Sequence, residues 1–305
     1  MRQQRIAALE AGKSEPQSLA VTALQKRLVD YPRGDIRYVA TADEQIEDLK
    51  KVTIDDVRKF YREFYGISEG EFAVAGQFDP QEVQKLAAEL FANWKAPVPY
   101  KRLLTPYRKN EVANLKIETP DKQNAMLIAG MNTKMSDDDP DYAAAIVANY
   151  ILGGSFSARL VTRIRHKEGL SYSVQSSLGA PAKDDGGTFI GLAMSAPQNT
   201  PKAEDSFRDE IQKTLKEGFT AEEVSAAQKA LLQERFVQRS QDGSMASLLV
   251  ARERFDRTLK FDESMDAKIG ALTVAQVNEA LRRHVDPAAM VVVKAGDFKK
   301  AGVYQ

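Results

Sequence analysis

The chain has 305 residues, of which 43% are hydrophobic and 28% are charged. This composition is typical of a folded globular protein and too apolar for a disordered chain. Lys and Arg together number 43, as do Asp and Glu, so no excess of positive charge indicates a nucleic-acid partner. The absence of cysteine excludes a disulfide framework, a thiolate zinc site and an iron–sulfur cluster.

The chain contains two histidines, His166 and His284, which lie far apart in the sequence. A zinc centre built on a pair of neighbouring histidines is therefore excluded. The most apolar stretch, residues 143–152, is too short to span a bilayer, so we expect no membrane-spanning segment.

Two segments align without a gap at a constant offset of 220. Residues 52–78 have the sequence VTIDDVRKFYREFYGISEGEFAVAGQF, and residues 272–298 have LTVAQVNEALRRHVDPAAMVVVKAGDF. Each predicts a threonine N-cap with a capping-box partner, then an amphipathic helix and an apolar strand that ends at glycine. Identical side chains are few, and we favour a duplicated unit over a chance match.

A repeating unit of about 220 residues fits only once into this chain, so one copy must be incomplete. We expect residues 1–94 to be the C-terminal remnant of one domain and residues 111–305 to form a complete second domain. Residues 95–110 carry prolines and basic residues and predict an extended linker. The first strands of the first copy would be missing, which suggests that the chain is a piece of a longer protein.

The second copy predicts strands at residues 112–118, 125–131 and 290–295, and a hairpin of residues 171–178 and 187–195. Asp139 and Pro140 predict the start of a helix, and Thr220 with Glu223 predicts a capping box for another. This order predicts an α+β fold, a mostly antiparallel sheet covered by a helical layer.

Several acidic residues and both histidines are candidates for a metal site. The aspartates at positions 137–139 and 141 lack the alternating acids and central glycine of a calcium loop, so we interpret them as a solvated helix cap. We interpret His284 and His166 as structural residues at helix ends.

Residues 159–174, RLVTRIRHKEGLSYSV, carry the most specific pattern. This segment resembles the pitrilysin/insulinase family of zinc peptidases, which includes mitochondrial processing peptidase. The resemblance extends to residues 42–94 and 111–298, and it implies a LuxS/mitochondrial processing peptidase-like metallohydrolase fold. The most similar members are long bacterial proteins, whose C-terminal half this chain matches.

The resemblance implies that catalytic zinc is held by an H-x-x-E-H motif in an N-terminal half, which we call the zinc-bearing half. This sequence has no such motif, so we expect the chain alone to bind no zinc and to be inactive. The resemblance also implies that Arg165 and Tyr172 contact a peptide substrate. Tyr172 would help to stabilise the oxyanion, and Arg165 would hold the peptide backbone or a carboxylate. Alternatively, Arg165 would stabilise a helix end and Tyr172 would belong to the core.

Three hypotheses about function remain open at this point. The chain is the non-catalytic C-terminal portion of a zinc-dependent endopeptidase, lining a peptide-binding chamber with the zinc-bearing half. Alternatively it is an inactive partner or scaffold subunit of a two-chain peptidase, or an unrelated α+β binding module. The absence of cysteine is compatible with a bacterial periplasmic or envelope location.

Overall fold

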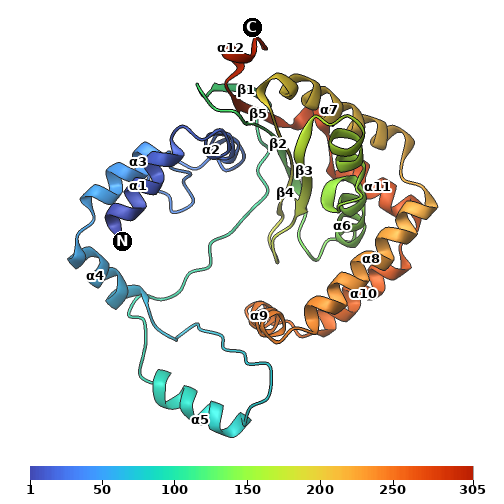
Figure 1. The fold of residues 1–305 in the computed structure, drawn as a ribbon. Helices are drawn as coiled ribbons and strands as arrows, with labels where there is room; N and C mark the ends of the chain where they lie inside the picture. Colours follow the sequence, from blue (N-terminus) through green and yellow to red (C-terminus); the bar gives the residue numbers. More distant parts are fainter. Residues whose placement is uncertain (305) are drawn as a thin grey trace. The chain divides into compact units, whose positions relative to one another are not determined.

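The computed structural model describes residues 1–304 (Figure 1). They form two compact units. Unit 1 contains Met1–Leu49, Thr105–Leu231 and the segment from Ile269 onward, and unit 2 contains Lys50–Leu104 and Leu232–Lys268. From the repeat, the sequence predicts domain boundaries at residues 94 and 111. These differ from the boundaries of the two units, and they stay a prediction.

Unit 1 is built on a five-stranded sheet with the strand order β1-β5-β2-β4-β3. Strands β1 and β5 are parallel, and the other neighbouring strands are antiparallel. The predicted α+β fold with a mostly antiparallel sheet is confirmed. The strands are β1 (Ala113–Glu118), β2 (Ala125–Lys134), β3 (Ser171–Gly179), β4 (Gly186–Ser195) and β5 (Val291–Gly296).

Helices make up most of the remaining regular structure. Residues 1–91 contain α1 (Arg2–Gly12), α2 (Pro16–Leu28), α3 (Ala42–Lys51), α4 (Ile54–Phe64) and α5 (Pro80–Phe91). The π-helices η1 (Tyr150–Gly154) and η2 (Val161–Lys167) follow α6 (Tyr142–Asn149). The later helices are η3 (Pro197–Asn199), α7 (Thr200–Glu217), α8 (Ala221–Arg239), α9 (Asp242–Glu253), α10 (Lys260–Ala271), α11 (Val274–His284), η4 (Pro287–Ala289) and α12 (Phe298–Ala301).

Helices cover both faces of the sheet in unit 1 (Figure 1). On one face, Leu24 of α2 belongs to a buried cluster with Ile128 and Val293. The next residues along these strands point to the opposite face, because side chains alternate along a strand. There Leu127 and Val292 lie around a small cavity with Phe207 and other residues of α7. The layer formed by α2 belongs to the first copy of the repeat, and no sequence pattern indicated it.

The repeat is visible in the helices. Both predicted capping boxes are present, with Thr53 and Asp56 at α4 and with Thr273 and Gln276 at α11. Helices α4 and α11 have the same length and begin 220 positions apart, and α3 and α10 end 220 positions apart.

The predicted strand of the first copy is absent. Strand β5 forms in the second copy because it lies between β1 and β2, which satisfy its backbone on both edges. Within residues 1–304, no strand pairs with residues 72–76. An apolar sequence becomes a strand only where a neighbour completes the ladder, so this prediction is wrong for the chain as it stands.

Helix α6 begins two residues later than the sequence predicts. Asp139 and Pro140 lie in a turn, and the first helical residue is Tyr142. The Asp139 carboxylate accepts a hydrogen bond from the amide of Asp141 at 2.8 Å, a local turn that delays the helix. Within residues 1–304, no helix is both long and apolar enough to cross a lipid bilayer.

Candidate functional site

Tyr172 lies on a β-bulge at the start of edge strand β3. Ser171 pairs with Ser195 and Ser173 pairs with Met194, so Tyr172 is the extra residue between them. The Ser171 hydroxyl lies 2.8 Å from the carbonyl oxygen of Ser173 and 2.5 Å from that of Met194, which fixes the bulge. A bulge re-aims a side chain away from the regular alternation of a strand. The Tyr172 side chain is 52% exposed, so it does not belong to the core.

Arg165 lies on the π-helix η2, which precedes that strand. It differs from Arg159 and Arg163, the other arginines of the segment. Arg159 donates to both carboxylate oxygens of Glu223, at 2.7 and 2.6 Å, and Arg163 donates to Glu168 at 3.1 Å. Among the contacts of residues 1–304, Arg165 has no carboxylate partner.

The carboxylates that pair with Arg159 and Arg163 are held in their charged form. Burial acts to raise the pKa of Glu168, but hydrogen bonds from Ser206 and Arg163 bring that pKa below its usual range. Burial likewise acts to raise the pKa of Glu223, and the Arg159 guanidinium brings it below the usual range. These pairs fix η2 and leave Arg165 as the arginine of this segment with a free charge.

Arg165 contacts an exposed aromatic ring instead. Its guanidinium lies 5.0 Å from the ring centre of Phe156, and the ring of His166 lies 5.7 Å from the same ring. Phe156 is 71% exposed, and the sequence analysis did not single it out. Within residues 1–304, no hydrogen bond joins Arg165 to Tyr172, so their joint contact with a peptide stays a prediction.

The chain between these two side chains turns sharply. Gly169 has a φ of +62°, a conformation that other residues adopt at a cost. The amide of Leu170 donates to the carbonyl of Ile164 at 3.0 Å and closes the end of η2. The Gly-Leu-x-Tyr pattern therefore carries the chain from the helix directly into the bulge. π-Helical turns and bulges are both frequent at functional sites.

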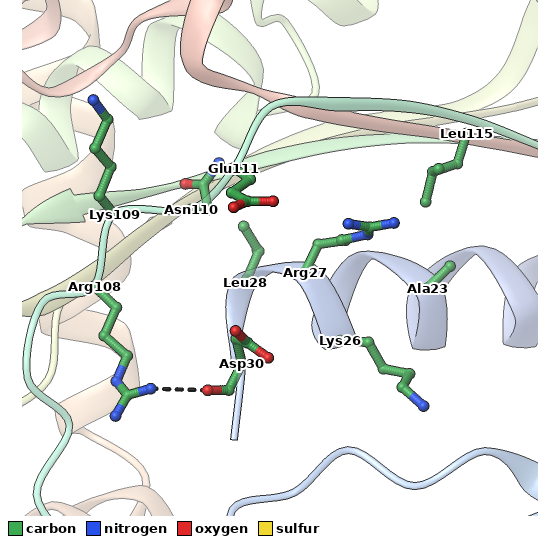
Figure 2. A pocket seen from close by; sticks show the side chains of 10 residues that line it. All are labelled: Ala23, Lys26, Arg27, Leu28, Asp30, Arg108, Lys109, Asn110, Glu111 and Leu115. Atoms are coloured by element: carbon green, nitrogen blue, oxygen red, sulfur yellow. Dashed lines mark hydrogen bonds between the residues drawn. The ribbon is translucent and has the colours of Figure 1, made fainter. Parts of the chain in front are cut away.

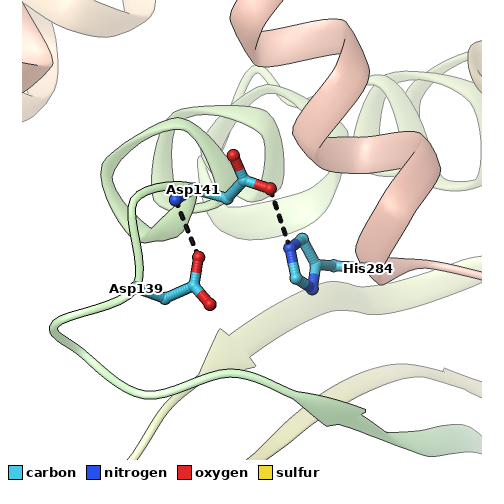
Figure 3. Close-up of side chains that lie close together, drawn as sticks. All are labelled: Asp139, Asp141 and His284. Carbon is cyan, nitrogen blue, oxygen red and sulfur yellow. Dashed lines mark hydrogen bonds and ion pairs between the residues drawn. The ribbon is translucent and has the colours of Figure 1, made fainter.

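Asp139, Asp141 and His284 form the only group among the described residues 1–304 whose ligand atoms could hold a metal ion, all within 4.8 Å (Figure 3). His284 Nε2 lies 3.2 Å from the Asp141 carboxylate, and Arg283 forms an ion pair with the same oxygen at 3.1 Å. His284 Nδ1 lies 3.1 Å from the Thr133 hydroxyl. These atoms already have partners, and the Arg283 charge repels a cation. The geometry supports the structural interpretation of His284.

A second cavity, of about 540 Å³, lies beside α2 in unit 1 (Figure 2). Four basic residues line it, Lys26 and Arg27 from α2 and Arg108 and Lys109 from the predicted linker, together with the acidic residues Asp30 and Glu111. Arg108 donates to the carbonyl of Asp30 at 2.8 Å. The C-terminal end of the predicted linker, residues 105–110, therefore belongs to unit 1.

Residues 51–231 match the peptidase M16 inactive domain. The chain belongs to this family. A solved M16 inactive domain from Pseudomonas fluorescens is similar over 97% of this chain and 69% of its own, with a TM-score of 0.79 and 25% identity. The resemblance to zinc peptidases is confirmed at the level of the family, and the hypothesis of an unrelated binding module is wrong.

Two curated relatives bear on the role of the M16 chain. An uncharacterized zinc protease of Streptomyces coelicolor is 28% identical over 60% of this chain and 40% of its own length. A non-peptidase homolog of Helicobacter pylori is 23% identical over 79% of this chain and 55% of its own. The chain thus spans about half the length of these relatives.

Proposed function

We propose that this M16 inactive domain is the non-catalytic C-terminal portion of a zinc-dependent endopeptidase. It contributes to a peptide-binding chamber and contacts the substrate through Arg165 and Tyr172. The zinc-bearing half supplies the metal, and the match of this chain to a family domain described as inactive supports that division. The similarity to a relative named as a zinc protease supports the reaction class.

The observation that carries this proposal is the arrangement around η2. Two of three arginines in one short segment are neutralised by carboxylates, and the third is not. The next structural feature along the chain is a bulge at Tyr172, whose side chain is exposed. An arginine without a carboxylate partner and an exposed tyrosine are both available to contact a peptide.

The two side chains suit different parts of a peptide. A tyrosine hydroxyl donates one hydrogen bond and suits the oxygen that becomes negative when a peptide carbonyl is attacked. An arginine presents a planar fork of donors that fits a carboxylate or two backbone carbonyls. The exposed ring of Phe156 limits the directions available to Arg165.

The alternative is an inactive partner subunit of a two-chain peptidase of the same family. The similarity to a relative named as a non-peptidase homolog favours it. In that case the zinc-bearing half is a separate polypeptide, and the chain stabilises it without touching the substrate.

The test is reconstitution of the chain with the zinc-bearing half encoded with it, using a quenched fluorescent peptide library. The parent complex is expected to cleave. Tyr172→Phe is expected to lower kcat about 100-fold, because a lost oxyanion donor costs a few kcal/mol in the transition state. Arg165→Ala is expected to raise KM about tenfold, because it removes a charge-assisted contact to bound peptide.

Matched controls separate these effects from general damage. Tyr107→Phe removes the hydroxyl of another partly exposed tyrosine of unit 1, and Lys167→Ala removes an exposed charge two positions from Arg165. Both are expected to cleave like the parent. If Tyr172→Phe and Arg165→Ala also cleave like the parent, the inactive-partner alternative replaces the proposal.

A further inference from the structure

The carboxylate of Glu168 joins η2 to helix α7. One of its oxygens accepts a hydrogen bond from Arg163 Nε at 3.1 Å, and the other accepts one from the Ser206 hydroxyl at 2.5 Å. Ser206 belongs to α7 and is 4% exposed, so this bond lies against a buried surface of the helix. Both oxygens of one carboxylate are therefore used, one within the segment of the candidate site and one on a helix outside it.

Arg163 forms a second link between the same two elements. Its other guanidinium nitrogens lie 3.4 Å from Glu210 and 3.5 Å from Asp209, both on α7. Glu210 is buried, whereas the Asp209 side chain is 63% exposed, so water screens the Glu210 contact less. We call Arg163, Glu168, Ser206 and Glu210 the α7 clamp.

The segment that carries Arg165 has few restraints of its own at its C-terminal end. The π-helix η2 is seven residues long, and a helix this short depends on outside contacts for its stability. Val161 and Ile164 are buried and hold its inner face. Within residues 1–304, a Cβ atom added at Gly169 would meet nothing within 4 Å, so packing does not fix the turn that follows. The clamp is the polar restraint at this end of η2.

Arg165 and Tyr172 differ in what holds them. Ser171 and Ser173, on either side of Tyr172, pair with β4, so the sheet fixes the bulge. Arg165 lies between Arg163 and Glu168, the two residues of η2 and its C-cap that the clamp attaches to α7. Loss of the clamp would therefore displace Arg165 while Tyr172 keeps its place.

We propose that Glu168 and Ser206 are positioning residues for Arg165. The α7 clamp holds the end of η2 so that the Arg165 guanidinium stays against the ring of Phe156 in one orientation. A side chain that is already ordered loses less conformational entropy when a ligand binds, so the clamp strengthens peptide binding. The inference rests on the proposed function for the contact with peptide, and it extends the candidate site to α7.

Nuclear magnetic resonance of the chain tests the positioning without any reaction. The Arg165 guanidinium lies 5.0 Å from the centre of the Phe156 ring, so the ring is expected to shift the signal of its Nε proton. Phe156→Leu removes the ring and gives the unshifted reference. Ser206→Ala is expected to move the Arg165 signal toward that reference. An Arg165 signal that is the same in Ser206→Ala and in the parent overturns the inference.

Cleavage by the reconstituted complex tests the consequence for peptide binding. Ser206→Ala is expected to raise KM about fivefold and to change kcat less than about twofold, because the clamp acts on a binding contact. Glu168→Gln places an amide group against one of its two donors and is expected to change KM in the same direction. A fall in kcat as large as the rise in KM overturns the inference.

Thr133→Val is the matched control for the loss of a buried hydroxyl. The Thr133 hydroxyl lies 3.1 Å from His284 Nδ1. Thr133 pairs with Gly187 at one end of β4, whereas the bulge pairs with Ser195 at the other end. Thr133→Val is expected to cleave like the parent. A rise in KM equal to that of Ser206→Ala would mean general damage to unit 1 and would overturn the inference.

A double variant decides whether the clamp acts through Arg165. Ser206→Ala combined with Arg165→Ala is expected to have the KM of Arg165→Ala alone, about tenfold above the parent, because no guanidinium remains to be positioned. Independent effects would multiply to a KM about 50-fold above the parent. That multiplication overturns the inference.

Failure of the inference and failure of the proposed function are distinguishable. If Arg165→Ala raises KM but Ser206→Ala does not, the proposed function stands and the inference fails. If Ser206→Ala moves the Arg165 signal but Arg165→Ala cleaves like the parent, the proposed contact with peptide fails and the positioning of Arg165 by the clamp stands.

Discussion

Helices α4 and α11 begin alike and differ in what surrounds them. Each starts after a threonine whose side chain and N3 partner close a capping box, and each is eleven residues long. Yet Val277 and Leu281 are buried in unit 1, while Val57 and Tyr61 are about half exposed in unit 2. Helix boundaries follow from a few neighbouring residues, whereas burial depends on layers supplied by distant parts of a chain. The comparison predicts which substitutions should have equal effects in the two copies and which should not.

Truncation of an equivalent pair of side chains should separate the copies most strongly. Leu281→Ala is expected to lower the free energy of unfolding by about 3 kcal/mol, because it leaves a cavity in a closed core. Tyr61→Ala is expected to change it by less than about 1 kcal/mol, because the ring is already half exposed. Urea unfolding followed by far-UV circular dichroism measures both. Equal losses would contradict the assignment of different environments.

A related contrast, between an arginine with a carboxylate partner and one without, occurs inside the candidate site. Arg159→Ala is expected to cost about 2 kcal/mol, because Glu223 would remain partly buried without its charge partner. Arg165→Ala, which breaks no ion pair, is expected to cost less than about 0.5 kcal/mol. Thermal unfolding of the two variants gives the comparison. A large loss for Arg165→Ala would assign that side chain to stability rather than to substrate.

Removal of the two caps should have similar local effects. Thr53→Ala and Thr273→Ala each remove a side chain that accepts a hydrogen bond from the N3 amide, at 3.2 and 3.3 Å. Each is expected to destabilise its own helix by about 1 kcal/mol. Exchange rates of amides in the first turn measure the local loss. For Thr273→Ala the loss should also lower the free energy of global unfolding, since α11 packs against α6. Thr53→Ala should leave that free energy unchanged. A measurable loss for Thr53→Ala would contradict the different surroundings assigned to α4 and α11.

The predictable parts of this molecule are those encoded within a few residues. The capping boxes at Thr53 and Thr273 and the hairpin of β3 and β4 follow from short patterns, and the structure confirms them. The strand expected at residues 72–76 fails, because a ladder needs a neighbour that no local pattern can supply.

The candidate site shows the same limit. The sequence selects Arg165 and Tyr172 through a family resemblance, but it gives no sign of the π-helical turn or of the bulge at Tyr172. These irregularities depend on close approach between elements. A Cβ atom on Gly153 of η1 would lie 2.5 Å from the Ser176 hydroxyl oxygen of β3, so a glycine is required where the two meet. Nor does the sequence show which arginines of the segment have carboxylate partners.

The smallest expected effect concerns the one chemical difference between the two capping boxes. In α4 the N3 residue is Asp56, which accepts from the amide of Thr53 at 2.8 Å, and in α11 it is Gln276, which accepts from the amide of Thr273 at 2.9 Å. Hydrogen bonds from the Thr53 hydroxyl and amide lower the pKa of Asp56. A depressed carboxyl pKa means that the stabilisation is complete above about pH 4 and is lost as the pH falls through the lowered value. An amide side chain does not titrate, so the box of α11 keeps its strength.

The amide proton shifts of Thr53 and Thr273 report directly on these two bonds as the pH is lowered below about 4. We expect the Thr53 signal to titrate and the Thr273 signal to stay constant while the chain remains folded. Exchanging the chemistry reverses the result. Asp56→Asn should make the α4 box insensitive to pH, and Gln276→Glu should make the α11 box sensitive. If Thr53 keeps titrating in Asp56→Asn, a charge other than the capping carboxylate controls the start of α4, and the two helix starts differ in more than this one side chain.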